Sequence, residues 1–186
     1  MTVSLRRVRL RAVVLLVLLY VWLARPTLTL LGVGAPLVLV GLLLRGWAAG
    51  IIEKERELAT GGPYAFTRNP LYLGSLLLGL GFAVAGGHWV WPTLFAGFFA
   101  AVYVPTMASE HRLLGELFGD RYRAYAARVP AFVPRLSAWR EAGTEGGPEA
   151  AGFRWARYVR NREWEAALGA VAAAAFLALK GWLTGT

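Results

Sequence analysis

Apolar positions are grouped in five long runs separated by short polar stretches. A membrane-spanning helix needs about 20 mostly apolar residues, with a range of about 17–25. The pattern therefore predicts an all-α, polytopic bundle of about five transmembrane helices. The first and third runs are short, so they require tilted helices or snorkelling flanks. Because no stretch alternates with a period of two, a membrane β-barrel is disfavoured. The runs cover residues 10–23, 28–52, 71–85, 89–107 and 164–183.

The composition supports a membrane protein. Of the 186 residues, 57% are hydrophobic and 17% are charged, whereas soluble domains carry about 25% charged residues. There is no cysteine, and His88 and His111 are the two histidines. Thiolate chemistry is therefore excluded, and no metal site built from several histidines is predicted.

The net charge of +9 is concentrated next to the apolar runs. This distribution indicates anionic lipid headgroups rather than nucleic acid as the partner. Arginines gather before the first run, in the 53–70 connection and in 109–162, whereas 86–88 contains no Lys or Arg. The positive-inside rule then predicts a cytoplasmic N-terminus and an outside C-terminus, in a bacterial or archaeal inner membrane. No small-residue cleavage site follows the first run, which indicates an uncleaved helix.

The long arginine-rich segment divides into two parts. Residues 110–135 show helical spacing and predict an interfacial helix with Tyr122, Tyr125 and Arg128 at the lipid headgroups. Residues 137–152 are rich in Gly, Ala and Glu and predict a mobile linker. The last run, 164–183, either completes the bundle or mediates dimerisation; we favour the former, and the oligomeric state stays open.

Three polar sites stand out at the ends of apolar runs. Arg68 and Asn69 precede the third run, where helix N–H groups attract anions, although Arg68 anchoring a lipid phosphate is an equal alternative. Glu110 follows the fourth run and pairs either with a cationic ligand or with a neighbouring arginine, Arg112 or Arg68. Arg45 lies inside the second run, either as a functional intramembrane charge or as a snorkelling side chain.

The combined pattern around these residues resembles one superfamily. The stretch GGPYAFTRNPLYLG, residues 61–74, is similar to the Gly-Pro-Tyr and Arg-His/Asn-Pro-x-Tyr-x-Gly pattern of the isoprenylcysteine carboxyl methyltransferase and phospholipid methyltransferase group. Residues 109–134 resemble the C-terminal motif of that group, with its Ser-Glu start and the tyrosines, arginine and prolines that follow. The resemblance covers roughly residues 41–135.

This resemblance implies a membrane-embedded methyltransferase that uses S-adenosylmethionine and releases S-adenosylhomocysteine. It implies a cofactor site at the cytosolic face and a lipid or lipophilic acceptor that enters from the bilayer. Arg68 and Glu110 are then the candidate catalytic residues. Arg68 would bind the carboxylate of the cofactor or orient an anionic acceptor, and Glu110 would bind the ammonium of the cofactor. The cofactor-binding residues implied by the motifs are Gly62, Pro63, Tyr64, Arg68, Asn69, Pro70, Tyr72, Leu73, Gly74, Glu110 and His111.

Two positions depart from the family pattern. Asn69 stands where the family often has histidine, and His111 stands where it usually has a second glutamate. The alternatives are an NADPH-dependent membrane reductase of the sterol-reductase-like class and a non-catalytic membrane scaffold. The expected organisation is N-terminal helices in 1–40, a methyltransferase core in 41–135, a cytosolic linker and basic segment in 136–163, and a C-terminal helix in 164–186.

Overall fold

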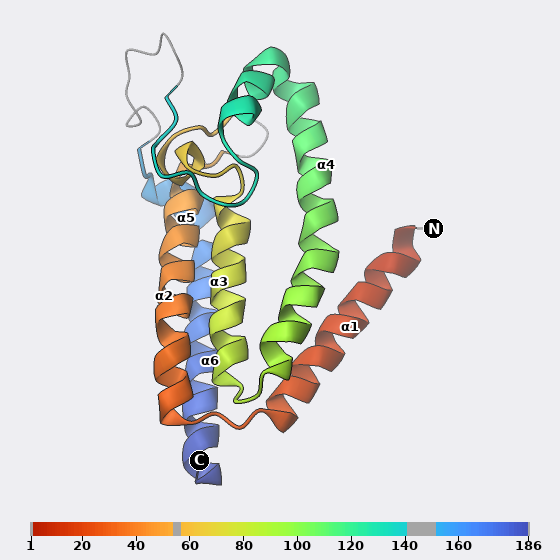
Figure 1. Ribbon diagram of the computed structural model, residues 1–186, viewed down its shortest axis with the longest axis vertical. Coiled ribbons are helices and arrows are strands. Elements are labelled where there is room, and N and C mark those ends of the chain that lie inside the picture. Colours follow the sequence, from red (N-terminus) through yellow and green to blue (C-terminus); the bar gives the residue numbers. More distant parts are fainter. Residues whose placement is uncertain (1, 54–56, 141–151, 186) are drawn as a thin grey trace.

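The computed structural model describes residues 2–53, 57–140 and 152–185, and every regular element in these ranges is helical. This agrees with the all-α class predicted from the sequence. Helices α2, α3, α4 and α6 run roughly alongside one another, α1 is inclined away from them, and the longer connecting segments gather at one end of the bundle (Figure 1). The helices are α1 (Thr2–Leu23), α2 (Leu28–Ile51), the 3-10 helix η1 (Gly62–Ala65), α3 (Pro70–Ala85), α4 (Val90–Arg128), α5 (Trp155–Arg160) and α6 (Glu163–Thr184).

Three of these helices are long and apolar enough to cross a membrane: α2, α4 and α6. Two shorter apolar helices, Val13–Leu23 and α3, accompany them. With 16 residues and a rise of about 1.5 Å per residue, α3 is shorter than the roughly 30 Å hydrocarbon core. The protein is therefore an α-helical membrane protein, and five complete crossings remain a prediction.

Helices α2 and α3 form the closest pair in the bundle. A Cβ atom at Gly41 would lie 2.6 Å from the carbonyl oxygen of Gly74. A Cβ atom at Gly81 would lie 2.6 Å from the carbonyl oxygen of Gly34. Small residues let helix backbones approach in this way inside membranes. This pair is the rigid frame against which the polar site is built.

Helix α4 differs from its predicted form. It is 39 residues long and continues well past the end of the apolar run at residue 107, so no separate interfacial helix begins near residue 110. Its backbone breaks at Gly119, where φ is 51° and ψ is −126°, a conformation that glycine adopts without steric cost. The helix ends at Arg128, short of the predicted 135, because Val129 precedes Pro130 and is extended, as residues before proline generally are.

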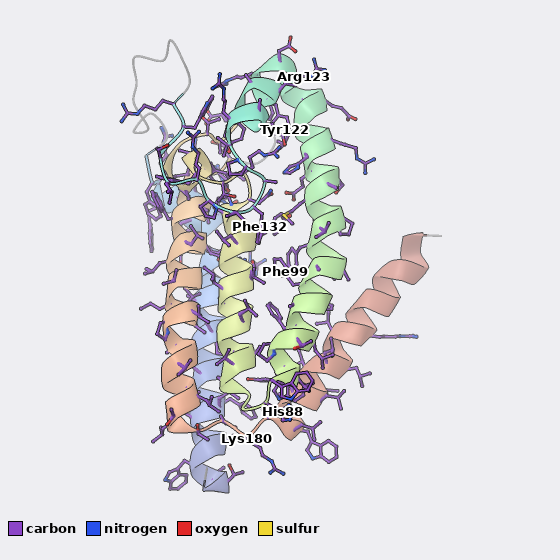
Figure 2. The ribbon with its side chains drawn as sticks, viewed as in Figure 1. His88, Phe99, Tyr122, Arg123, Phe132 and Lys180 are labelled. Carbon is purple, nitrogen blue, oxygen red and sulfur yellow. The ribbon has the colours of Figure 1, made fainter. Side chains whose placement is uncertain are left out.

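The break at Gly119 brings the last turns of α4 back against the molecule, as Figure 2 shows near the labelled Tyr122 and Arg123. Tyr122 and Tyr125 are buried, with 5% and 2% of their surface exposed. The prediction that these two tyrosines lie at lipid headgroups is therefore wrong. Their spacing was read as that of a surface helix, whereas the bend turns the same face inward.

The segment after α4 is tied to the motif turn by backbone hydrogen bonds. The N–H of Arg68 donates to the Pro130 carbonyl at 3.0 Å. The N–H groups of Arg135 and Trp139 donate to Phe66 and Ala65 at 2.9 Å each. The two regions that carry the sequence motifs are thus joined directly. Most of the predicted linker, residues 141–151, lies outside the described residues.

The C-terminal helix α6 packs against α2 and lies in the bundle. At its far end the Lys180 ammonium donates to the Val21 and Trp22 carbonyls, at 2.6 and 3.0 Å. These carbonyls belong to the last turn of α1, where helices leave acceptors unpaired. The prediction that the last run completes the bundle is confirmed for this chain.

Candidate active site

A cavity of about 340 Å³ lies at the end of the bundle where the connecting segments gather. This volume falls within the range of about 300–1,000 Å³ that is usual for small-molecule sites. Its wall combines charged and aromatic side chains from distant parts of the chain. The residues that matter below are Arg45, Tyr64, Arg68, Asn69, Pro70, Tyr72, Ser75, Tyr103, Glu110, Tyr122, Tyr125, Asn161 and Glu163.

The motif turn forms one side of this cavity. Gly62 adopts φ +56°, a value that L side chains avoid, and it begins the short helix η1 with Pro63 as the second residue. Pro70 occupies the first position of α3, where its missing N–H costs nothing. Thr67 donates its hydroxyl to the Phe132 carbonyl at 3.0 Å. These local preferences fix the turn that carries Tyr64, Arg68 and Asn69.

Tyr64 is buried, and its hydroxyl has no hydrogen-bond partner among the described residues. Burial raises the pKa of Tyr64, and neighbouring groups that include Tyr125 and Glu110 add to the rise, so the hydroxyl stays protonated and able to donate. Its carbonyl is engaged, because the Tyr125 hydroxyl donates to it at 2.7 Å. A buried hydroxyl without a partner is costly, and a ligand in the cavity would supply one.

The hydrogen-bonding groups of the Arg68 guanidinium are also only partly paired. Its Nη1 donates to the Tyr122 hydroxyl at 3.2 Å. Its Nε is buried and has no partner among the described residues. A guanidinium without a carboxylate favours an anionic ligand. The geometry does not leave the Arg68 side chain free on the surface, as an anchor to lipid phosphate would require.

The two departures from the family pattern contact each other. The Asn69 amide nitrogen Nδ2 lies 3.0 Å from His111 Nε2 and donates to the Ala131 carbonyl at 2.7 Å. With its second hydrogen directed at His111, Nε2 accepts, which corresponds to a neutral imidazole protonated on Nδ1. The residues at the two positions that depart from the family pattern are therefore joined to each other by a hydrogen bond in this chain.

Glu110 interacts with neither of the arginines considered for it. Its Oε1 accepts from the Tyr72 hydroxyl at 2.5 Å, and no ion pair involving Glu110 occurs among the described residues. The Tyr72 ring lies 5.1 Å from that of Tyr103, so α3 and α4 together orient the carboxylate. Glu110 therefore offers an unpaired negative charge to the cavity.

The motif residues divide by position. Tyr64, Arg68, Asn69, Pro70, Tyr72 and Glu110 line the cavity, and His111 reaches it through Asn69. Gly62, Pro63, Leu73 and Gly74 lie outside the lining. For Gly74 the reason is packing, because a Cβ atom there would lie 2.6 Å from Arg45 Cγ and 2.8 Å from the Gly41 carbonyl oxygen.

The cavity also receives an ion pair that sequence reasoning found only in part. Arg45, left open between function and snorkelling, donates from Nε and Nη2 to Glu163 at 2.5 and 2.9 Å. Its Nη1 donates to the Ser75 hydroxyl. Glu163 was not among the predicted site residues. Its one sequence signal was a carboxylate at the very start of an apolar run.

Taken together, the fold and the site define a helical membrane protein with a polar, ligand-sized cavity at one end of its bundle. The family model for phospholipid methyltransferases matches residues 8–121. The chain therefore belongs to the phospholipid methyltransferase family. The resemblance predicted from the two motifs is confirmed.

The chain is also similar to individual proteins of known name. It is 37% identical to the cobalt-zinc-cadmium resistance protein CzcN of Cupriavidus metallidurans, over 66% of this chain and 56% of that protein. It is 34% identical to the nickel-cobalt-cadmium resistance protein NccN of Alcaligenes xylosoxydans xylosoxydans, over 66% and 57%. It is 32% identical to the protein-S-isoprenylcysteine O-methyltransferase of Schizosaccharomyces pombe, over 45% and 36%.

The matched region spans just over half the length of the two metal-resistance proteins. No solved structure matches the chain.

Proposed function

We propose that the protein is an integral membrane methyltransferase that uses S-adenosylmethionine and acts on a lipid or lipophilic acceptor. The observation that carries the proposal is the convergence of the family motif residues on one cavity that holds unsatisfied polar groups. The Tyr64 hydroxyl and the Arg68 Nε are buried and unpartnered among the described residues. Glu110 adds a carboxylate that accepts a hydrogen bond from the neutral phenol of Tyr72.

These groups fit the polar end of the cofactor. An amino acid presents a carboxylate and an ammonium side by side, and Arg68 and Glu110 supply the opposite charges within one cavity. Tyr64 offers a further donor. Asn69 and His111 hold the Arg68 turn to the end of α4, because the Asn69 amide bonds both His111 and the Ala131 carbonyl.

The bound cofactor would supply a methyl group on a sulfonium. The work left to the chain is alignment of the acceptor and exclusion of water. The rings of Tyr72 on α3 and Tyr103 on α4 contact each other in the cavity wall. The last turns of α4, with the buried Tyr122 and Tyr125, cover the cavity. Both features favour a water-poor site that an acceptor reaches from the bilayer.

We further propose five crossings with the N-terminus in the cytoplasm and the C-terminus outside. The C-terminus lies at the end of the bundle opposite the cavity (Figure 1). The described parts of the arginine-rich segments, residues 57–70, 109–140 and 152–162, lie at the cavity end, which the positive-inside rule assigns to the cytoplasm. In this orientation the cavity has access to cytosolic cofactor.

Isothermal titration of the purified protein with S-adenosylhomocysteine and with NADPH tests the proposal. We expect binding of the first and none of the second. Binding of NADPH alone would support a reductase, and binding of neither would support a scaffold. Transfer of tritiated methyl groups to a total lipid extract, followed by chromatography, then identifies the acceptor. Absence of any labelled product would contradict the methyltransferase.

The names of the two metal-resistance relatives suggest that the methylated product acts in metal resistance. We propose that this product contributes to tolerance of divalent transition metals. The described residues include no group of three or more metal-ligating side chains, and the proposal does not require the protein to bind metal. A deletion strain should lose growth in cobalt, zinc or cadmium, and the wild-type gene but not Glu110→Gln should restore it. Restoration by that variant would separate tolerance from methyl transfer.

A further inference from the structure

Arg45 is the second arginine of the cavity, and the cofactor does not account for it. The side chain comes from α2, six residues before the end of that helix at Ile51, or about 9 Å along its axis. It crosses α3 at Gly74, where a side chain would collide with Arg45 Cγ. The glycine of the family motif therefore makes room for an arginine that the motif itself does not include.

The guanidinium is held but not saturated. Of its five N–H donors, two reach Glu163 and one reaches Ser75, which leaves two. Ser75 can accept because its own hydroxyl donates to the Leu71 carbonyl at 2.8 Å. The Arg45 side chain is 24% exposed and that of Glu163 is 8% exposed. Since both residues line the cavity, the remaining donors are available to a ligand there.

Glu163 belongs to α6, which lies outside the region that matches the family. As the first residue of that helix, its carboxylate is favoured by the helix dipole. It fixes the plane of the Arg45 guanidinium through two hydrogen bonds, the bidentate geometry that a carboxylate provides. The last helix of the chain therefore positions a group in the cavity wall.

We propose that Arg45, positioned by Glu163 and Ser75, binds an anionic oxygen group on the acceptor, either a carboxylate or a phosphate. The inference rests on the proposed function, since it assigns to the acceptor the cation that the cofactor leaves unused. Arg68 and Arg45 then divide the cavity into a cofactor end and an acceptor end. An intramembrane arginine that faces a cavity is expected to mark a ligand pathway.

The experiment uses the full chain in detergent with saturating S-adenosylhomocysteine and three six-carbon probes: hexanoate, hexyl phosphate and hexanol. Calorimetry should show binding of at least one anion, at least about tenfold tighter than hexanol, because charge-assisted hydrogen bonds are lost with the alcohol. The tighter anion distinguishes carboxylate from phosphate. Equal binding of hexanol, or no binding of either anion, would overturn the proposal.

The deciding variant is Arg45→Met with Glu163→Met, which replaces the ion pair by apolar side chains of similar length. Such replacements of buried pairs usually preserve folding. We expect anion affinity to fall by about tenfold or more, with affinity for S-adenosylhomocysteine unchanged. The matched control is Arg162→Met with Glu165→Met, an exposed pair on the same helix end, which should leave anion affinity unchanged. Unaltered anion binding in the first variant contradicts a role for Arg45.

Two further measurements distinguish a failure of this proposal from a failure of the proposed methyltransferase function. Arg45→Lys keeps the charge but not the bidentate geometry, and should give an intermediate anion affinity. In the methyl-transfer assay the bound anion should be competitive with lipid extract and not with S-adenosylmethionine; the reverse pattern overturns the inference. If the wild type binds no S-adenosylhomocysteine, the proposed function fails, while the anion titrations without it still report on Arg45.

Discussion

Two polar clusters lie against one cavity, and the chain builds them in different ways. The first, which we call the motif cluster, joins Arg68 and Asn69 of the turn to Glu110 and His111 of α4. The second, the Arg45 cluster, joins α2, α3 and α6 through Arg45, Ser75 and Glu163. The motif cluster is held by backbone hydrogen bonds around it and keeps groups unsatisfied. The Arg45 cluster contains a complete ion pair.

This difference suggests that the motif cluster serves ligand binding, whereas the Arg45 cluster stabilises the helix bundle. The buried Arg68 Nε of the motif cluster and the neighbouring Tyr64 hydroxyl have no partner among the described residues, and they cost free energy until a ligand arrives. The bidentate pair in the Arg45 cluster links helices even in the empty protein. We therefore expect substitutions in the Arg45 cluster to affect unfolding first and substitutions in the motif cluster to affect cofactor binding first.

The largest effect should come from Glu163→Gln. It leaves the Arg45 guanidinium, which is 24% exposed, without its counter-charge, and we expect a cost of about 3 kcal/mol, the lower end of the range for buried pairs. The free energy of unfolding in mixed detergent micelles measures this loss. Glu165→Gln, in an exposed pair, should change it by less than about 1 kcal/mol. Equal effects from the two substitutions would remove the distinction between the clusters.

Cofactor binding should respond most to the motif cluster. Arg68→Ala and Glu110→Gln each remove a charged partner, and we expect affinity for S-adenosylhomocysteine to fall by about 100-fold. Asp120→Asn changes an exposed carboxylate on the same helix and should have no effect. Unchanged affinity in both Arg68→Ala and Glu110→Gln would reject the assigned roles.

Gly74→Ala tests the close contact between Gly74, which belongs to the family motif, and Arg45 of the Arg45 cluster. The added methyl group would press on Arg45 Cγ and the Gly41 carbonyl, and overpacking of this kind costs about 1–3 kcal/mol. Gly97→Ala meets no atom within 4 Å and should be neutral or stabilising. Thermal unfolding midpoints compare the two variants, and a neutral Gly74→Ala would show that α2 and α3 can separate.

The contact between Asn69 and His111 can be tested by reverting both to the family pattern. Asn69→His and His111→Glu should each weaken cofactor binding by about tenfold, because each leaves one partner unpaired. The double variant should recover most of this loss, as coupled residues do in a double-mutant cycle. Additive losses, measured by titration with S-adenosylhomocysteine, would mean that the pair is not a unit.

The smallest effect should be that of Tyr64→Phe. It removes a buried hydroxyl that has no partner among the described residues, so stability should hold or rise slightly. Affinity for S-adenosylhomocysteine should fall by about fivefold, as expected for one neutral hydrogen bond. Tyr125→Phe is the contrast, because its hydroxyl bonds the Tyr64 carbonyl and its loss should lower stability.

The sequence predicted the helical class and the apolar runs from local periodicity, and the resemblance to the family implied the residues of the motif cluster. It did not predict the inward turn of Tyr122 and Tyr125, which depends on one backbone conformation at Gly119. It also did not pair Arg45 with Glu163, since 118 positions separate them. Contacts of that range depend on how helices pack, and packing has no signature in a single run.

The separation of Arg45 and Glu163 has a consequence for how the protein is made. Arg45 and Glu163 are 118 residues apart in the chain. At about 5–20 residues per second, a ribosome therefore adds Glu163 roughly 6–24 seconds after Arg45. During that interval α2 holds a cation inside an apolar helix without its partner carboxylate. We therefore expect that the arginine snorkels to the nearby helix end, or is sheltered during insertion, until α6 arrives.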